Sequence, residues 1–98
     1  MYVTIVTGRV AQENWVPLVQ LFERRIAKNP PPRLLKSCLV QSEKEPSCWR
    51  IVFLWNDKAA FEEYHATRKA DDYIELMCDA GTVPECHGYH SRGWYEKV

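Results

Sequence analysis

The segment CWRIVFLW, from Cys48 to Trp55, constrains the fold more than any other part of this 98-residue chain. Its β-branched and aromatic residues predict a strand. Because side chains alternate along a strand, one face carries Trp49, Ile51, Phe53 and Trp55, and the other carries Cys48, Arg50, Val52 and Leu54. A sheet with one solvated face alternates apolar and polar residues. This strand is apolar on both faces apart from one arginine, so both faces have to be covered.

The remaining segments supply the other elements of a single domain spanning residues 1–98. Further strands are predicted at Tyr2–Val10, Leu34–Gln41 and Val83–Arg92, and helices at about Trp15–Lys28, Lys58–Thr67 and Asp71–Ala80. The prolines of NPPPR end the first helix, and Asn56 or Asp57 caps the second. The order β-α-β-β-α-(α)-β predicts an α+β, ferredoxin-like βαββαβ fold with a four-stranded antiparallel sheet and its helices on one face.

The helices of one chain can cover only one face of this sheet. We therefore expect a homodimer in which each copy packs its open sheet face against the other. The alternative is a monomer whose open face is covered by its own C-terminal tail, Trp94–Val98.

The composition of the chain argues against several classes of binding partner. The 13 basic and 13 acidic residues cancel, which argues against nucleic acid or an anionic membrane as the main partner. The N-terminus lacks the pattern of a signal peptide, and no apolar run approaches the ~20 residues that span a bilayer. A cytoplasmic location is the expectation. There the four cysteines would be free thiols, and the spacing of Cys38, Cys48, Cys78 and Cys86 fits no zinc site.

The junction between the apolar strand and the next helix, WNDKAAFEEYH, resembles the antibiotic biosynthesis monooxygenase (ABM) domain, a branch of the dimeric α+β barrel superfamily. That family has a Trp at the strand end, a polar cap, an aromatic residue inside the helix and a His near its end. Trp55, Asn56-Asp57, Phe61 and His65 fill these places. The first strand, the long helix and LLKSCLVQS also fit, so the resemblance covers nearly the whole chain.

The resemblance implies two ferredoxin-like subunits whose sheets close into a barrel, each with a pocket between helices and sheet. Similar domains include cofactor-independent oxygenases of anthrones and quinols, haem-degrading enzymes and isomerases. The haem-degrading branch uses an Asn ending the first strand, a Trp in the second helix and a His in the following helix. Here the strand ends Val6-Thr7-Gly8, the helix offers Tyr64, and residues 71–80 contain no His. We therefore expect no haem, and no metal, flavin or other cofactor.

The second helix carries the candidate catalytic residues. Phe61, Tyr64 and His65 share one helix face by their spacing. An imidazole exchanges protons near neutral pH, so His65 is the candidate base and Tyr64 the candidate hydrogen-bond donor to substrate. The candidate substrate-binding walls are the aromatic residues Trp49, Phe53, Trp55 and Phe61. Alternatively, His65 is bonded to a backbone carbonyl and the aromatic residues form only core; which sheet face meets the helices stays open.

The resulting hypothesis is a cofactor-free monooxygenase acting on an aromatic or polycyclic small molecule in a pocket between helices and sheet. The alternative is a non-catalytic dimer of the same fold that binds a small apolar ligand or has a structural role. An isomerase or decarboxylase using the same base without oxygen is a third possibility. An RNA-binding role is disfavoured, because the third strand lacks the glycine-and-aromatic pattern of RNA-recognition sheets.

Overall fold

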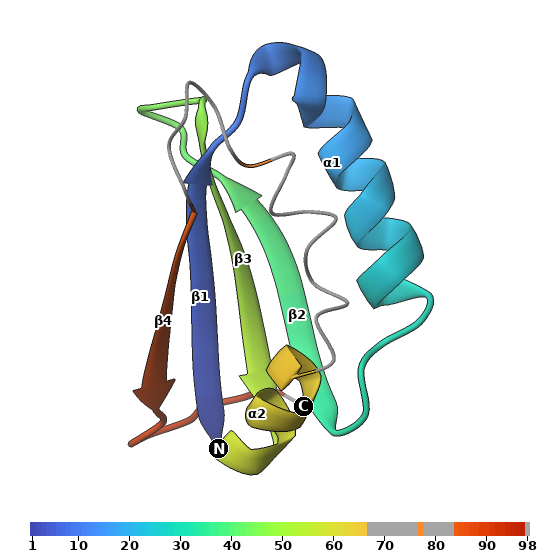
Figure 1. Ribbon diagram of the computed structural model, residues 1–98. Helices are drawn as coiled ribbons and strands as arrows, with labels where there is room; N and C mark the ends of the chain where they lie inside the picture. Colours follow the sequence, from blue (N-terminus) through green and yellow to red (C-terminus); the bar gives the residue numbers. More distant parts are fainter. Residues whose placement is uncertain (67–76, 78–83, 98) are drawn as a thin grey trace.

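The chain forms a four-stranded antiparallel sheet with helices on one face, in a computed structural model that describes residues 1–66, 77 and 84–97 (Figure 1). The strands are β1 (Tyr2–Arg9), β2 (Leu34–Gln41), β3 (Cys48–Trp55) and β4 (Glu85–His90), in the order β2-β3-β1-β4. The helices are η1 (Gln12–Asn14), α1 (Trp15–Phe22), η2 (Glu23–Ala27) and α2 (Lys58–Ala66). The predicted ferredoxin-like α+β fold is confirmed. The helix predicted at Asp71–Ala80 lies outside the described residues, except for Met77.

The first helical segment is continuous but changes its geometry along its length. It opens with the 3₁₀ turn η1, continues as α1 and closes with the π-helical turn η2. In that last turn the N–H of Lys28 donates to the carbonyl of Glu23, 2.9 Å away and five residues earlier. Pro17 fits because it lies in the first turn of α1, where its missing N–H is no loss. Wide turns of this kind are often found at functional sites.

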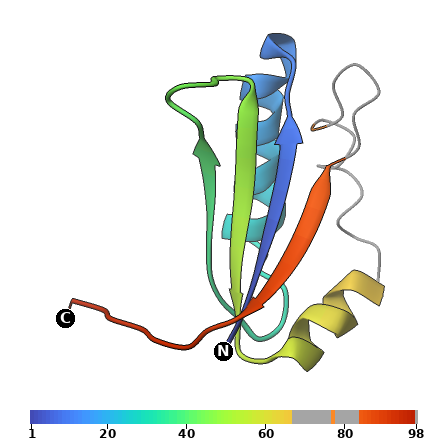
Figure 2. The same ribbon diagram turned by 90° about the vertical axis from the view of Figure 1, so that its left-hand side faces the viewer.

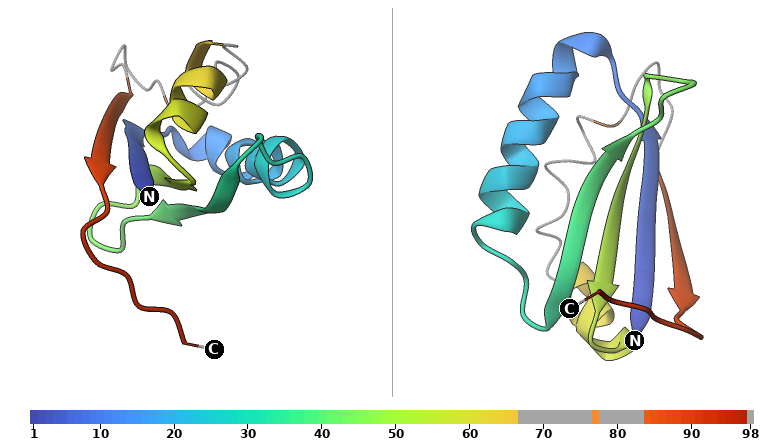
Figure 3. Two further views of the ribbon diagram at one scale, coloured as in Figure 1. Left: turned by 90° about the horizontal axis from the view of Figure 1, so that it is seen from below. Right: turned by 180° about the vertical axis from the view of Figure 1, so that it is seen from behind.

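The cap of α2 is Asp57 rather than Asn56. Its Oδ1 accepts the N–H of Ala60 at 2.8 Å, which satisfies one of the donors left unpaired at a helix start. The cap fixes where α2 leaves β3, and therefore which face of the helix turns towards the sheet. Figure 2 shows α2 leaving the lower end of the sheet, and the view from below in Figure 3 (left) shows it on the same side of the sheet as α1.

The aromatic face of β3 is the one that meets the helices. Four β3 residues on that face are at most 7% exposed and form the centre of the core: Trp49, Ile51, Phe53 and Trp55. On β1, Thr4 and Val6 pair with Phe53 and Ile51 and continue the same face. The indole N–H of Trp55 donates to the hydroxyl of Thr4 at 3.0 Å. The indole N–H of Trp49 is also buried, and it has no hydrogen-bond acceptor among the described residues.

The opposite sheet face has an apolar centre and a partly charged rim. Val52 pairs with Ile5 on one side and Cys38 on the other, and Leu54 pairs with Val3. Tyr89 of β4 and Val40 of β2 are 51% and 42% exposed. This face is therefore only partly covered within one chain.

The C-terminal tail runs along this open side of the sheet (Figure 3). It reaches β2, where the carboxylate of Glu96 bonds the ammonium of Lys36 and Lys36 Nζ lies 5.3 Å from the centre of the Trp94 ring. Trp94 and Tyr95 themselves remain 52% and 85% exposed. The tail is anchored at the edge of the open face and leaves Val40 and Tyr89 accessible.

Candidate functional site

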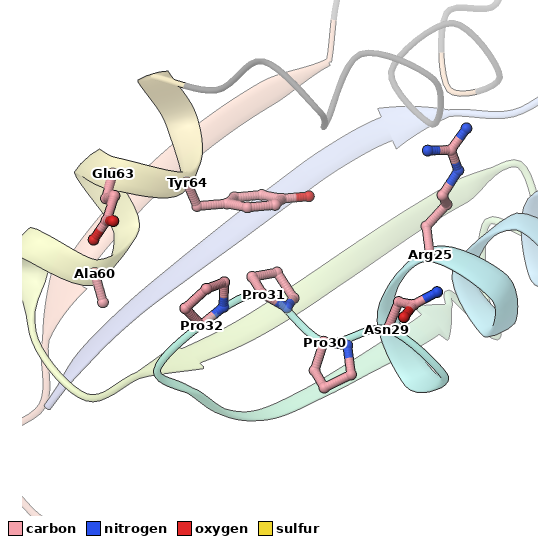
Figure 4. Close-up of a pocket in the computed structure, with 8 residues that line it drawn as sticks. All are labelled: Arg25, Asn29, Pro30, Pro31, Pro32, Ala60, Glu63 and Tyr64. Carbon is pink, nitrogen blue, oxygen red and sulfur yellow. The ribbon is translucent and has the colours of Figure 1, made fainter.

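A cavity of about 460 Å³ opens between the end of the first helical segment and α2 (Figure 4). Its volume lies in the range of small-molecule sites. The described residues that line it come from η2, from the loop before β2 and from α2: Arg25, Asn29, Pro30, Pro31, Pro32, Ala60, Glu63 and Tyr64. The cavity lies on the helix side of the sheet, at the end where β3 passes into α2.

The proline loop forms one wall of this cavity. Each proline ring fixes its own φ angle, so three in succession leave this wall little conformational freedom. The loop is also tied to its surroundings: the carbonyl of Pro31 accepts the N–H of Leu34 at 3.2 Å, and that of Arg33 accepts the N–H of Asn56 at 3.0 Å. The result is a rigid apolar wall.

Arg33 joins the proline loop to α2. Its guanidinium bonds Glu63 at 2.9 Å and lies 3.5 Å from Asp57. Asp57 caps α2 and Glu63 lies two turns further along the helix, so one side chain holds two points of α2 against the loop. The backbone of Arg33 has φ 63°, in the left-handed region that costs a non-glycine residue about 1 kcal/mol. This ion-paired arginine therefore links the two segments, the proline loop and α2, that line the cavity.

Tyr64 forms the facing wall, and the core supports its ring. Its centroid is 5.3 Å from that of Trp55 and 6.3 Å from that of Phe53, and these two rings stack on each other at 5.6 Å. Figure 4 shows the Tyr64 ring across from Pro31 and Pro32, with its hydroxyl directed towards the side where Arg25 stands. Such contacts restrict the ring to one orientation.

The two ends of the cavity differ in charge. Arg25 and Asn29, from η2 and the turn after it, place a guanidinium and an amide at one end (Figure 4). Glu63 stands at the α2 end, where Arg33 already compensates its carboxylate. The cavity therefore has apolar walls between two polar ends.

The structure separates the two residues predicted to act in chemistry. Tyr64 lines the cavity, whereas His65 is exposed and stacks on Phe61 at 5.5 Å, outside the described lining. Phe61 also contacts Tyr2, whose ring in turn meets His90 edge-on at 5.2 Å. His65 therefore belongs to a row of ring contacts that runs from α2 through Phe61 and Tyr2 to His90, beside the described cavity lining. Its role as a base stays a prediction.

The predicted aromatic walls lie behind the cavity rather than in it. Trp55 and Phe53 are buried and touch the ring of Tyr64. Trp49 packs against Trp15 at 6.0 Å, beside the start of α1, and Phe61 is half-buried against Trp55. Trp55 and Phe53 therefore support the cavity wall through Tyr64. Direct substrate contact by any of the four stays a prediction.

Sequence reasoning missed most of the lining residues. It placed Arg25 in the predicted helix Trp15–Lys28 and interpreted the prolines only as the end of that helix. Three consecutive prolines directly before a strand were the available signal, since they predict a rigid loop rather than a mobile one. Arg25 had no such signal, because nothing in the sequence distinguishes it from its neighbour Arg24.

Other candidate chemistry is sparse in the described part of the chain. Cys38, Cys48 and Cys86 are free thiols, and partial burial raises the pKa of the Cys86 thiol above its ordinary value. Residues 1–66, 77 and 84–97 contain no group of three or more His, Cys, Asp or Glu side chains placed to hold a metal ion. His87 and His90 lie on opposite faces of β4, opposite Ile5 and Tyr2, because they are three residues apart on a strand.

No helix within the described ranges combines the length and apolar character needed to cross a membrane.

The fold is shared with solved ABM proteins, although the sequence itself matches no protein-family model and no curated protein. An ABM protein from Deinococcus radiodurans superposes with a TM-score of 0.77 at 16% identity, covering 100% of this chain and 99% of the other. SnoaB, a cofactor-independent oxygenase from Streptomyces nogalater, gives 0.73 at 17% identity and 98% coverage of both chains.

Two further structures show the range of ligands bound by proteins of this fold. The monooxygenase of Streptomyces coelicolor gene ActVA-Orf6, solved with nanaomycin D, gives a TM-score of 0.74 at 16% identity over 99% of this chain and 92% of the other. MhuD, solved with two manganese protoporphyrin IX molecules per active site, gives 0.75 at 14% identity over 99% and 100%. At such low sequence identity, the structural similarity establishes the shared fold and nothing about activity. The resemblance predicted from the sequence is therefore confirmed for the fold.

Proposed function

We propose that this protein is a cofactor-independent monooxygenase acting on an aromatic or polycyclic small molecule held in the cavity between Tyr64 and the proline loop. The observation that carries the proposal is the 460 Å³ cavity with an aromatic wall supported from the core. It occurs in a chain that shares its fold, end to end, with cofactor-independent oxygenases. The structural neighbours suggest the type of reaction, and the cavity suggests where in this protein it would take place.

The reaction that this site would accommodate needs a proton acceptor and a dry pocket. Loss of a proton from the methylene carbon of an anthrone-like substrate gives an electron-rich anion, which reduces oxygen and forms a C–O bond. One oxygen atom stays as the new carbonyl, and the other leaves as water with the two hydrogens of the methylene. Apolar walls such as Pro31 and Tyr64 would protect the anion and the peroxide from solvent.

The two predicted catalytic residues have unequal support within this proposal. Tyr64 lines the cavity and carries a hydroxyl that can hydrogen-bond the oxygen of a phenol or enolate. His65 follows it on the same helix but is exposed, so we place it at the outer edge of the site, where a base can pass its proton to solvent. Its ring contact with Phe61 fixes its orientation there.

Oxygen uptake with anthrone and naphthoquinol substrates tests the proposal. We expect the purified protein to consume oxygen and form the quinone product, and Tyr64→Phe to lower kcat by roughly tenfold or more, as loss of a catalytic hydrogen bond does. His65→Gln should lower kcat as well, whereas Lys58→Gln, on the exposed start of α2, should not. Binding without oxygen uptake would favour the non-catalytic ligand-binding alternative, and turnover without oxygen uptake an isomerase or decarboxylase.

The same proposal includes a homodimer that buries the open sheet face. Val3, Ile5, Val52 and Leu54 form an apolar centre on that face, and the tail is anchored only at its β2 edge. Exposed Val40 and Tyr89 extend the apolar surface to both outer strands. A second copy has the same face to offer, and such self-complementary contacts are the usual basis of twofold dimers.

A further inference from the structure

We propose that Arg33 is the positioning residue of the cavity: through its ion pairs with Asp57 and Glu63 it holds α2, and Tyr64 with it, at a fixed distance from the proline loop. The inference rests on the cavity of the proposed function, but it does not depend on turnover. Arg33 is not among the described residues that line the cavity, so its effect on a ligand is indirect.

The core holds α2 only loosely. Of the nine residues of α2, all of which the structure describes, only Ala60 is buried. Phe61 and Tyr64 are half-buried against Trp55, and the rest of the helix is exposed. A helix that buries so little apolar surface belongs to the part of a fold that opens most easily. It needs a further attachment if it is to form a fixed wall of the cavity.

The side chain of Arg33 provides this attachment at two points of the helix. Its guanidinium lies 2.9 Å from the carboxylate of Glu63 and 3.5 Å from Oδ1 of Asp57. The same Oδ1 accepts the N–H of Ala60 at 2.8 Å, so one oxygen joins the helix cap to the arginine. Isolated exposed ion pairs contribute little to stability, but a network of several charges can contribute more.

The main chain of Arg33 strengthens the same connection. Its carbonyl accepts the N–H of Asn56 at 3.0 Å, which ties the loop to the junction between β3 and α2. Its φ angle of 63° would suit a glycine, whereas an arginine in this conformation is strained. Backbone strain of this kind persists where the surroundings hold it, and it is often found beside functional sites. Here the strained residue is the one that contacts α2.

This attachment determines where Tyr64 stands. Glu63 and Tyr64 are neighbours on α2, and both line the cavity (Figure 4). The proline loop is tied separately to β2 through the bond between Pro31 and Leu34. Release of Glu63 would therefore let the Tyr64 ring move while the loop stays in place, and a ligand between them would lose contact on one side. Small displacements of this kind lower both affinity and rate.

The salt dependence of anthrone binding tests this role in oxygen-free buffer, where no oxidation takes place. Anthrone is neutral, so screening by salt affects its binding through the ion pairs of the protein, and exposed pairs are screened strongly. Tryptophan fluorescence quenching gives the dissociation constants. We expect the wild type to bind about threefold more tightly than Arg33→Gln at low salt and equally tightly at about 1 M sodium chloride. The ratio cancels the general effect of salt on apolar binding.

Matched variants separate positioning from a loss of stability. Glu63→Gln should weaken binding, and it should do so less in an Arg33→Gln background than alone. Glu62→Gln makes the same change one residue earlier, where the carboxylate pairs with Lys58 at 3.8 Å, and should leave the affinity unchanged. Arg33→Lys, which keeps the charge, should restore part of the affinity. Additive effects of Arg33→Gln and Glu63→Gln, or an equal loss in Glu62→Gln, would overturn the proposal.

Fluorine NMR of the protein labelled with 3-fluorotyrosine tests the role of Arg33 without a ligand. The Tyr64 signal is assigned by its loss in Tyr64→Phe. It should shift in Arg33→Gln and stay in place in Glu62→Gln. An unchanged signal in Arg33→Gln would overturn the proposal. If Arg33→Gln folds poorly, Glu63→Gln should shift the same signal.

The outcomes separate this inference from the proposed function. If anthrone does not bind to the wild type, the proposed function is wrong and the fluorine signal of Tyr64 alone decides the role of Arg33. Anthrone binding that depends on Arg33, but without oxygen uptake in air, would support the inference and overturn only the enzyme. Oxygen uptake that Arg33→Gln leaves unchanged in both kcat and KM would overturn the inference and leave the enzyme standing.

Discussion

The hydroxyl of Thr4 accepts the indole N–H of Trp55 at 3.0 Å, and both residues are at most 1% exposed. Thr4→Val should leave that indole buried without an acceptor and lower the free energy of unfolding by about 1–3 kcal/mol. Urea unfolding monitored by circular dichroism measures the change. Thr4→Ser, which keeps the hydroxyl, is the matched control and should be affected less. Equal stability of the two variants would contradict the role given to this bond.

Gly88 makes room for the side chain of Tyr2. A Cβ atom at position 88 would lie 1.9 Å from the Tyr2 hydroxyl oxygen and 2.7 Å from the adjacent ring carbon. Tyr2 packs against Phe61 and His90, so its ring cannot shift without loosening these contacts. Gly88→Ala should therefore lower stability by about 1–3 kcal/mol, measured by thermal unfolding.

The double variant Tyr2→Phe with Gly88→Ala provides the control for that steric explanation. Removing the hydroxyl removes the closest clash, so the double variant should lose less stability than the two single losses added together. Simple additivity would show that the effect of Gly88→Ala has another cause.

Arg33 combines an unfavourable backbone angle with two ion pairs. Arg33→Ala loses the bonds to Glu63 and Asp57 but keeps the left-handed backbone at φ 63°. Arg33→Gly loses the same bonds and relieves the backbone, so it should be about 1 kcal/mol more stable than Arg33→Ala. Both should weaken the binding of an anthrone substrate in the cavity relative to wild type. Unchanged affinity in both would mean that the cavity keeps its width without this arginine.

The anchoring of the C-terminal tail should depend on pH. The bond from Lys36, aided by its charge, holds the pKa of the Glu96 carboxyl below its ordinary value of 4.5. Because this pKa is lowered on folding, the contact is complete above about pH 4.5 and is lost as the pH falls through the folded value. NMR signals of Trp94 should move towards free-chain positions in that range. In the variant Lys36→Gln, the Trp94 signals should be at free-chain positions already at neutral pH.

The homodimer can be tested with two identical substitutions on different surfaces. Val52→Lys places a charge in the apolar centre of the open sheet face, opposite Ile5, and should convert the dimer into a monomer. Val16→Lys changes a 65% exposed position on α1 and should leave the dimer intact. Sedimentation equilibrium distinguishes the two. A wild-type protein that sediments as a monomer would contradict the proposal directly.

The fold was predictable because its strands carry strong local signals. The bounds of β2 and β3 agree with those expected, and the apolar faces of β3 fix its place inside the sheet. The predicted last strand is shorter at both ends than expected: β4 begins at Glu85 and ends at His90. Strand ends depend on pairing with β1, which stops at these positions and which no pattern within the segment reveals.

The candidate site was less predictable because it forms between distant segments. Spacing correctly placed Phe61 and Tyr64 on the inner side of α2, but the same rule put His65 beside them, where the structure shows an exposed side chain. A helix face spans a wide arc, and the cap at Asp57 decides which part of it meets the sheet. The wall opposite Tyr64 depends on the backbone of Arg33, which no residue preference would suggest.

The proline wall also limits the directions from which the protein can donate hydrogen bonds to a ligand. Pro30, Pro31 and Pro32 carry carbonyl oxygens but no amide hydrogens, so ten or so ångströms of backbone can accept hydrogen bonds and donate none. A ligand oxygen turned towards that wall would lose its water and gain nothing. Hydrogen-bond donors to a bound ligand must therefore come from the other residues that line the cavity, so the proline wall makes the site polar from some directions only.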